Sequence, residues 1–287
     1  MIIGDNRRAV IQNIKTFAES GEFHNKVELN DPVLTAKQSR AITSTYLENR
    51  KHLSYRLKTG IGVTMAKAAT RVINKDTDII GIEKIPKDLG GVIITSNHFS
   101  PLENTVIRHL TNALGRKKLG IISQTSNFAM TGIIGFLMNY ADTIPISTDP
   151  RYLARDFLSV LKERLVDQND AILLYPEQEM WFTYRKPRPP KNGAYFYAAK
   201  LGVPIISCFV EMIDLPEDDT AEFKKVKYVL HVLDVLYPDA GKTAKENTEN
   251  LAQADYSLKK ACYEQVYGKA LTYEFDSTDI AGWKDTL

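Results

Sequence analysis

A histidine and a carboxylate follow an apolar run in the first half of the chain. The run 91–96 is typical of a buried strand, and His98 and Glu103 come shortly after it, five residues apart. An imidazole can take a proton from a hydroxyl, and a carboxylate bonded to its Nδ1 fixes the tautomer and stabilises the imidazolium. The spacing therefore predicts His98 as a general base, Glu103 as its orienting acid, and a substrate with a hydroxyl group.

Glu103 also has a second interpretation. Ser100, Pro101 and Glu103 have the spacing of a capping box, with Ser100 as N-cap and proline at the first helical position. In that arrangement the Glu103 carboxylate reaches back to the Ser100 amide. Both interpretations place Glu103 on the first turn of a helix, so the spacing alone does not separate them.

A second apolar run ends in another carboxylate. The run 171–175 also reads as a buried strand, and Glu177 follows it. Ligands of an open α/β sheet gather at the carboxyl ends of its strands, so Glu177 and His98 are expected at the same edge. We therefore predict one cleft between the two strand ends.

The elements that must position these residues alternate along the chain. Short apolar runs alternate with helical stretches of about a dozen residues, which favours an α/β fold: a mostly parallel mixed sheet flanked by helices. We expect residues 1–75 to form an N-terminal helical extension and 76–287 the α/β domain. Strands are predicted at 91–96, 118–124, 143–147, 171–175, 204–211 and 225–236, and helices at 5–20, 35–74, 102–114, 128–139, 151–167, 193–201 and 250–270.

Composition narrows the class of protein. The chain has 287 residues, 44% of them hydrophobic and 25% charged, which is ordinary for a globular protein. Its formal net charge of +2 is too small to indicate nucleic acid as a partner. Its two cysteines, Cys208 and Cys262, form neither a disulfide framework nor a zinc spacing. We expect a cytoplasmic protein with no bound metal.

Two stretches bear on contact with lipid. Residues 119–141 carry no charge, but their polar side chains disfavour a bilayer span, so they are expected to line a lipid pocket, touch a membrane surface or form a core helix. The helical stretch 35–74, expected to break near Gly60 and Gly62, is basic and amphipathic. It either lies on an anionic membrane or presents a solvated face.

Four sequence blocks together resemble the glycerophospholipid acyltransferases, the lysophosphatidate acyltransferases and their relatives. The family's first block, Asn-His-x-Ser-x-x-Asp, is matched by Asn97, His98 and Ser100, with Glu103 in the acidic place. The third, Phe-Pro-Glu-Gly-Thr-Arg, is matched at 175–177 and departs at 178–180, where Gln, Glu and Met stand. The second and fourth blocks are matched by the run 144–146 followed by Arg151, and by the Val-Pro-Ile-Ile run 203–206.

The resemblance implies acyl transfer from an acyl thioester, on coenzyme A or acyl carrier protein, to a hydroxyl of a lysophospholipid or glycerol-phosphate-type acceptor. His98 would remove the hydroxyl proton, with no cofactor and no covalent enzyme intermediate. The enzyme would contact the inner face of the membrane peripherally. Residues with an implied role in substrate binding are Asn97, Ser100, Arg151, Glu177, Arg185, Lys186 and Arg188.

The altered third block leaves alternatives open. In the family, the arginine of that block helps to hold the acceptor phosphate, and Arg185, Lys186, Arg188 and Lys191 could replace it. The basic loop that contains them could instead lie over anionic head groups or be a solvated turn. The acceptor could also be something other than a glycerol phosphate, or the chain could be a catalytically silent lipid-binding protein on the same fold.

Overall fold

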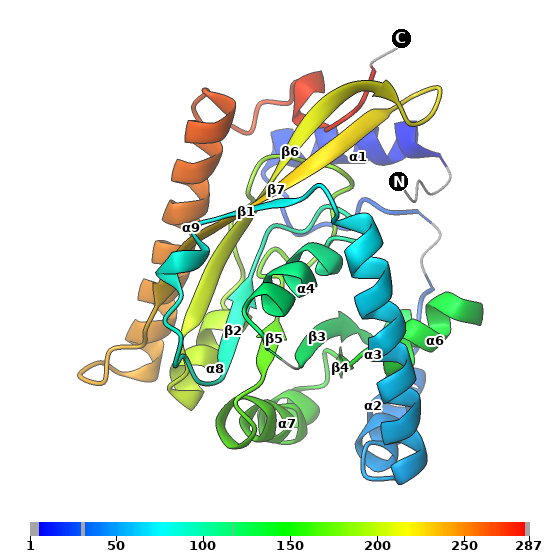
Figure 1. Cartoon of the computed structure of the whole chain (residues 1–287), viewed down its shortest axis with the longest axis vertical. Coiled ribbons are helices and arrows are strands. Elements are labelled where there is room, and N and C mark those ends of the chain that lie inside the picture. The colour runs from blue at the N-terminus through cyan, green and yellow to red at the C-terminus, as the bar shows by residue number, and fades with distance from the viewer. Residues whose placement is uncertain (1–5, 30–31, 117, 285–287) are drawn as a thin grey trace.

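The computed structural model describes residues 6–29, 32–116 and 118–284 (Figure 1). Its strands form one seven-stranded sheet in the order β1-β7-β6-β2-β5-β3-β4. All neighbouring strands are parallel except β6 and β7, so the predicted mostly parallel mixed sheet is confirmed. The strands are β1 (Asp78–Ile80), β2 (Val92–Thr95), β3 (Leu119–Gln124), β4 (Thr143–Ile146), β5 (Ala171–Leu173), β6 (Ile205–Asp218) and β7 (Lys224–Leu236).

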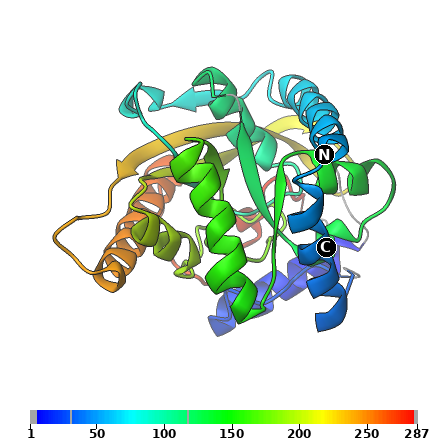
Figure 2. The same ribbon diagram turned by 90° about the horizontal axis from the view of Figure 1, so that it is seen from below.

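The sheet is covered on both faces, which explains why its central strands are continuous apolar runs. Side chains alternate between the faces of a strand. Ile93 and Ile172 belong to a core with the helices after β4, β5 and β7, whereas Ile94 and Leu173 pack with α4 (Asn104–Ala113). Figure 2 shows helices on both sides of the sheet. The predicted α/β sandwich is therefore confirmed.

The helices after β4 and β5 agree closely with the predicted ranges, whereas the helix after β7 begins six residues before the predicted range 250–270. The helix after β4 consists of α7 (Leu158–Lys162) between π-helical segments Tyr152–Phe157 and Glu163–Asp167. The helices after β5 and β7 are α8 (Gly193–Leu201) and α9 (Ala244–Tyr267). The predicted helix 128–139 is instead two short helices, α5 (Thr125–Phe128) and α6 (Gly132–Tyr140). Two 3₁₀ turns lie at Ile82–Lys84 and Ser277–Asp279.

The predicted helical stretch 35–74 is broken, but not at the expected glycines. The break falls at residues 50–52, between α2 (Ala36–Asn49) and α3 (Leu53–Ile73), and α3 continues through Gly60 and Gly62. Gly62 is needed for packing, because a Cβ there would lie 2.4 Å from the carbonyl oxygen of Tyr140 at the end of α6. Within the described ranges no helix is both long enough and apolar enough to cross a membrane.

The first helix packs against the loop after β5. Val10, Ile11 and Ile14 of α1 (Arg7–Ser20) are buried in one cluster with Trp181 and Phe182. The helix thus covers residues that follow Glu177 in the sequence. The division into an extension at 1–75 and a domain at 76–287 stays a prediction.

Candidate active site

His98 and Glu103 are hydrogen-bonded at the carboxyl end of β2. Nδ1 of His98 bonds Oε1 of Glu103, and because an ionised carboxylate only accepts, Nδ1 is the donor. The predicted contact between these two residues is therefore confirmed. The His98 side chain is 20% exposed, and no described residue forms a hydrogen bond with its Nε2. Nε2 is thus available to take a proton from a bound hydroxyl.

Glu103 bonds both the imidazole and the Ser100 amide, but the predicted capping box is wrong, because α4 begins at Asn104 and Glu103 itself is its N-cap residue. While Oε1 bonds the imidazole, Oε2 accepts from the backbone amides of Phe99 and Ser100, each at 2.5 Å. Glu103 is 2% exposed, so these donors compensate a charge that is buried. One buried carboxylate therefore fixes both the imidazole tautomer and the backbone of the loop that carries it.

Tyr175 stacks on the imidazole of His98. The two rings are 4.1 Å apart between centroids and inclined by 5°. Burial raises the pKa of the Tyr175 hydroxyl well above its ordinary value, and the negative charge of Glu103 raises it further. The phenol is therefore neutral, and its ring restricts rotation of His98 from the strand next to β2.

Glu177 reaches the same edge of the sheet from β5, as expected. Its Oε2 accepts from the backbone amide of His98 at 3.2 Å and from Nη2 of Arg188 at 2.9 Å, and its Oε1 accepts from the Arg188 amide at 3.0 Å. Glu177 is 3% exposed and Arg188 is 2% exposed. Burial lowers the pKa of the Arg188 guanidinium, and Glu177 opposes this effect. The buried ion pair thus holds the backbone of the histidine loop.

Asn97 and Ser100 also fix this loop. Asn97 exchanges two hydrogen bonds with the backbone of Val210 in β6, at 3.0 and 2.8 Å, so its side chain extends the sheet ladder. The Ser100 hydroxyl accepts from the amide of Leu102 at 3.2 Å and begins the turn into α4. Their predicted contact with substrate stays a prediction.

The other predicted cationic residues do not gather at His98. Arg185 donates to Asp214 at 2.5 Å, and Lys186 pairs with Asp279 at 2.6 Å. Both cations are buried. Arg151 is exposed and follows β4, which is separated from β5 by β3. A role for Arg151 in acceptor binding stays a prediction. Arg185 and Lys186 are paired with carboxylates in the C-terminal part of the chain, Asp214 and Asp279.

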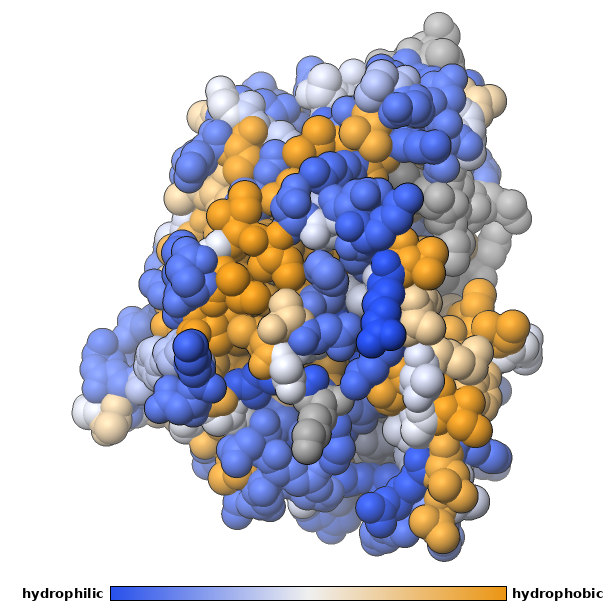
Figure 3. Space-filling model, in the orientation of Figure 1, coloured by the Kyte–Doolittle hydropathy of each residue, from blue (hydrophilic) through white to orange (hydrophobic). Residues whose placement is uncertain are grey.

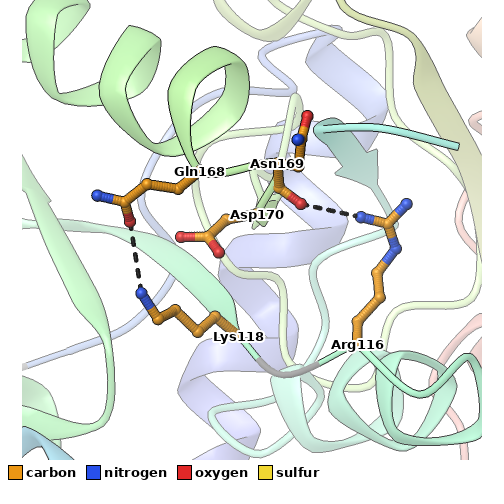
Figure 4. A pocket seen from close by; sticks show the side chains of 5 residues that line it. All are labelled: Arg116, Lys118, Gln168, Asn169 and Asp170. Atoms are coloured by element: carbon orange, nitrogen blue, oxygen red, sulfur yellow. Dashed lines mark hydrogen bonds between the residues drawn. The ribbon is translucent and has the colours of Figure 1, made fainter.

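A separate pocket of about 340 Å³ lies at the opposite edge of the sheet, where β3 and β5 begin. In Figure 4, Arg116 and Lys118 face Asn169 and Gln168 across it, with hydrogen bonds of 3.4 Å on each side. None of the predicted site residues lines this pocket. No group of three or more His, Cys, Asp or Glu side chains in the described ranges could hold a metal ion.

Sequence reasoning did not assign a site role to Gln178 and Glu179, which directly follow Glu177. Gln178 has a left-handed backbone, with φ of 67°, which few residues other than glycine adopt. The next residue, Glu179, accepts a hydrogen bond of 2.7 Å from Gln124 at the end of β3. The sequence did contain a signal at position 178. The family has glycine there and this chain has glutamine, which must adopt the left-handed backbone that glycine adopts without strain.

Comparison with known proteins identifies the domain that contains this arrangement. A family model described as Acyltransferase matches residues 76–211, which include His98, Glu103 and Glu177. Residues 76–211 thus form a domain of the acyltransferase family. This confirms the family and the enzyme class predicted from the four sequence blocks.

A solved structure shares the fold of this acyltransferase. It is the 1-acyl-sn-glycerophosphate (LPA) acyltransferase PlsC from Thermotoga maritima, with a TM-score of 0.53 and 16% sequence identity. The similarity covers 82% of this chain and 96% of that chain. No curated protein matches the sequence.

Proposed function

We propose that this acyltransferase transfers an acyl group from an acyl thioester, on coenzyme A or acyl carrier protein, to a hydroxyl of a glycerolipid acceptor of the lysophospholipid or glycerol-phosphate type. The observation that carries the proposal is the His98–Glu103 pair, with Nδ1 bonded to the carboxylate and Nε2 available at a strand end. A role in phospholipid biosynthesis agrees with the family.

The reaction follows from this geometry. Nε2 of His98 takes the acceptor proton, and the alkoxide oxygen forms a bond to the thioester carbonyl carbon. The tetrahedral intermediate collapses with loss of the thiolate, which receives the proton from the imidazolium. Glu103 stabilises the cationic imidazolium between these steps, a contribution of roughly 10² to 10⁴ in rate for such proton transfers. The products are an acyl ester and a free thiol.

A silent lipid-binding protein is the alternative, and the structure offers an argument against it. Glu103 and Tyr175 hold the His98 ring in one orientation, by a hydrogen bond and a stacked contact. A protein that only holds lipid does not need an oriented imidazole. The enzyme is therefore the function that the site supports best.

Thiol release tests the proposal. Acyl-coenzyme A or acyl carrier protein is incubated with the protein and a mixture of monoacyl lipids, and free thiol is measured with and without the acceptors. We expect release that depends on the acceptor, matched by one new acyl ester per thiol in the lipid extract. Release that is equal without acceptor would show hydrolysis, and no release with either donor would leave only the lipid-binding alternative.

We also propose that the enzyme contacts the membrane peripherally, at the cytoplasmic face. The residues Leu53, Leu57 and Ile61 recur every four positions along α3 and therefore share one face. Together with Ile133 and Ile134 of α6 they form the α3–α6 surface, and each is more than half exposed. Figure 3 shows apolar residues gathered over the side of the molecule where these helices lie.

Cationic residues next to the α3–α6 surface fit an anionic lipid bilayer. Arg56, Lys58 and Arg71 lie on α3 and are exposed. An interfacial helix of this kind inserts its apolar face into the head-group region while its cations attract anionic lipids. An acceptor lipid could then reach His98 without leaving the bilayer completely.

Vesicle sedimentation tests this contact. Binding to vesicles that contain anionic lipid should exceed binding to vesicles of zwitterionic lipid, and Leu57→Gln with Ile61→Gln should reduce it at least about tenfold. The matched control is Val33→Gln, because Val33 is an exposed apolar residue outside this surface. Unchanged binding of the double variant would contradict a role for α3.

A further inference from the structure

The polar groups bonded around His98 carry an excess of negative charge. The Glu103 carboxylate bonds the imidazole, and the Glu177 carboxylate accepts from the His98 amide and pairs with one guanidinium, that of Arg188. The Glu179 carboxylate acts on Arg188 through its charge. His98 itself must be neutral to act as a base. The formal charge of this group therefore favours a substrate head group that is not strongly anionic.

Arg188 is not available to bind an anion. Its Nε and Nη2 donate to Glu177 at 3.1 and 2.9 Å, its Nη1 donates to the Phe23 carbonyl at 2.8 Å, and Nη2 also contacts the Glu179 carbonyl. The guanidinium lies 4.5 Å from the centre of the Trp181 ring. A phosphate that replaced these partners would leave Glu177 as a buried charge without its cation, which is strongly unfavourable.

Two of the neighbouring cations, Arg185 and Lys186, cannot replace Arg188 in this conformation. Arg185 bonds Asp214 and the carbonyl of Thr278, and Lys186 bonds Asp279 and the carbonyl of Glu274. These partners belong to β6 and to the C-terminal segment, and the contacts bury both cations. The segment after Glu177 thus has no available guanidinium for a phosphate monoester, which is best held by planar bidentate donors.

Glu179 instead presents a hydrogen-bond acceptor. Its side chain is half-buried, Oε1 accepts from Gln124, and no described residue donates to Oε2. Nη2 of Arg188 lies between the carbonyl oxygens of Glu179 and His98, at 3.5 Å from that of His98, so the two residues flank the same guanidinium. Gln124 ends β3, which pairs with β5, so the Glu179 carboxylate lies at the same edge of the sheet as His98, and its charge acts on Arg188. An acceptor whose hydroxyl lies at His98 would have its head group at this edge.

We infer that Glu179 is a specificity-determining residue, and that the acceptor lipid presents a hydrogen-bond donor to it, an ammonium or a sugar or glycerol hydroxyl, rather than a phosphate monoester. The inference rests on the proposed acyl transfer and narrows its acceptor. A donor bonded to a carboxylate forms a charge-assisted hydrogen bond, whereas a phosphate dianion would be repelled by the surrounding carboxylates.

Competing acceptors test the inference. Rates of ester formation are measured with lysophosphatidate, which has a phosphate monoester, with lysophosphatidylethanolamine, which has an ammonium, and with a monoacyl glycolipid, which has only hydroxyls. We expect kcat/KM for one of the latter two to exceed that for lysophosphatidate at least about tenfold, which is a difference of about 1.4 kcal/mol. The better of the two identifies which donor the site takes.

Variants of Glu179 separate specificity from general activity. Glu179→Gln should reduce the preference over lysophosphatidate at least about tenfold, and Glu179→Arg should raise kcat/KM for lysophosphatidate. The matched control is Glu217→Gln, on the exposed end of β6, which should change neither quantity. A wild-type preference for lysophosphatidate, or the same ranking in Glu179→Gln, would overturn the inference while acyl transfer stands. If no acceptor is esterified, or if His98→Ala esterifies all three at the wild-type rate, the proposed function itself fails and the inference fails with it.

Discussion

Glu103 accepts from His98 Nδ1 through one carboxylate oxygen and from two backbone amides of the same loop through the other. The base and the loop that presents it are therefore fixed by one side chain. A shift of Glu103 would change the tautomer and the position of His98 together.

Replacing Glu103 by glutamine should lower kcat by roughly 10² to 10⁴. The glutamine oxygen can accept from Nδ1 or from the amides of Phe99 and Ser100, but its NH₂ group then faces a donor. Steady-state kinetics should show KM for the donor nearly unchanged, and circular dichroism should confirm the fold. A kcat within twofold of wild type would show that Glu103 serves only to fix the backbone of the loop at Phe99 and Ser100.

The Glu177–Arg188 ion pair should show strong thermodynamic coupling. Arg188→Met leaves Glu177 charged and buried without its cation, so the free energy of unfolding should fall by about 3–5 kcal/mol. The double variant with Glu177→Gln should be more stable than the sum of the single changes predicts, by about 0.5–3 kcal/mol. Urea unfolding of the four proteins measures this. Strictly additive losses would show that the pair does not act as a unit.

Gln178→Gly should raise the free energy of unfolding by about 1 kcal/mol, because glycine adopts the left-handed backbone without the steric cost of a side chain. The matched control is Gln178→Ala, which keeps a Cβ at the same φ of 67° and should give no gain. Equal stability of the glycine and alanine variants would show that a side chain at position 178 does not strain the backbone.

Two glycines of α3 should respond oppositely to alanine. At Gly62 a Cβ would clash with the Tyr140 backbone, so Gly62→Ala should destabilise the protein by about 1–3 kcal/mol. At Gly60 nothing lies within 4 Å, so Gly60→Ala should stabilise it by about 0.5–1 kcal/mol through helix propensity. Unfolding curves measured for both variants check the packing of α3 on α6, and the same sign for both changes would contradict it.

Much of the fold could be predicted because the central strands are buried on both faces. Apolar runs that end before His98 and Glu177 indicate neighbouring strand ends, and the structure has β2 and β5 paired. The position of the break before α3 could not be predicted from its glycines. Gly62 allows close packing against Tyr140, far along the chain, and does not end the helix. The three-residue strand β1 was also missed, because so short a run carries no periodic signal.

The contact between His98 and Glu103 could be predicted because both residues follow the end of one strand, five positions apart. The partners of Arg185, Lys186 and Arg188 could not be predicted, because a basic loop reads the same in sequence whether its cations face solvent, lipid or buried carboxylates. Their ion pairs depend on tertiary contacts with Asp214, Asp279 and Glu177. The availability of Glu179 likewise follows only from the structure.

The rate of ester formation by His98→Ala tests the role of the imidazole most directly. Donor, acceptor and folded protein are held at equal concentrations for wild type and variant, the acyl product is quantified by mass spectrometry, and donor binding is measured separately by calorimetry. We expect the rate to fall at least about 10²-fold while donor affinity stays within a factor of about two. Equal rates for the two proteins would contradict the assignment of His98 as the general base.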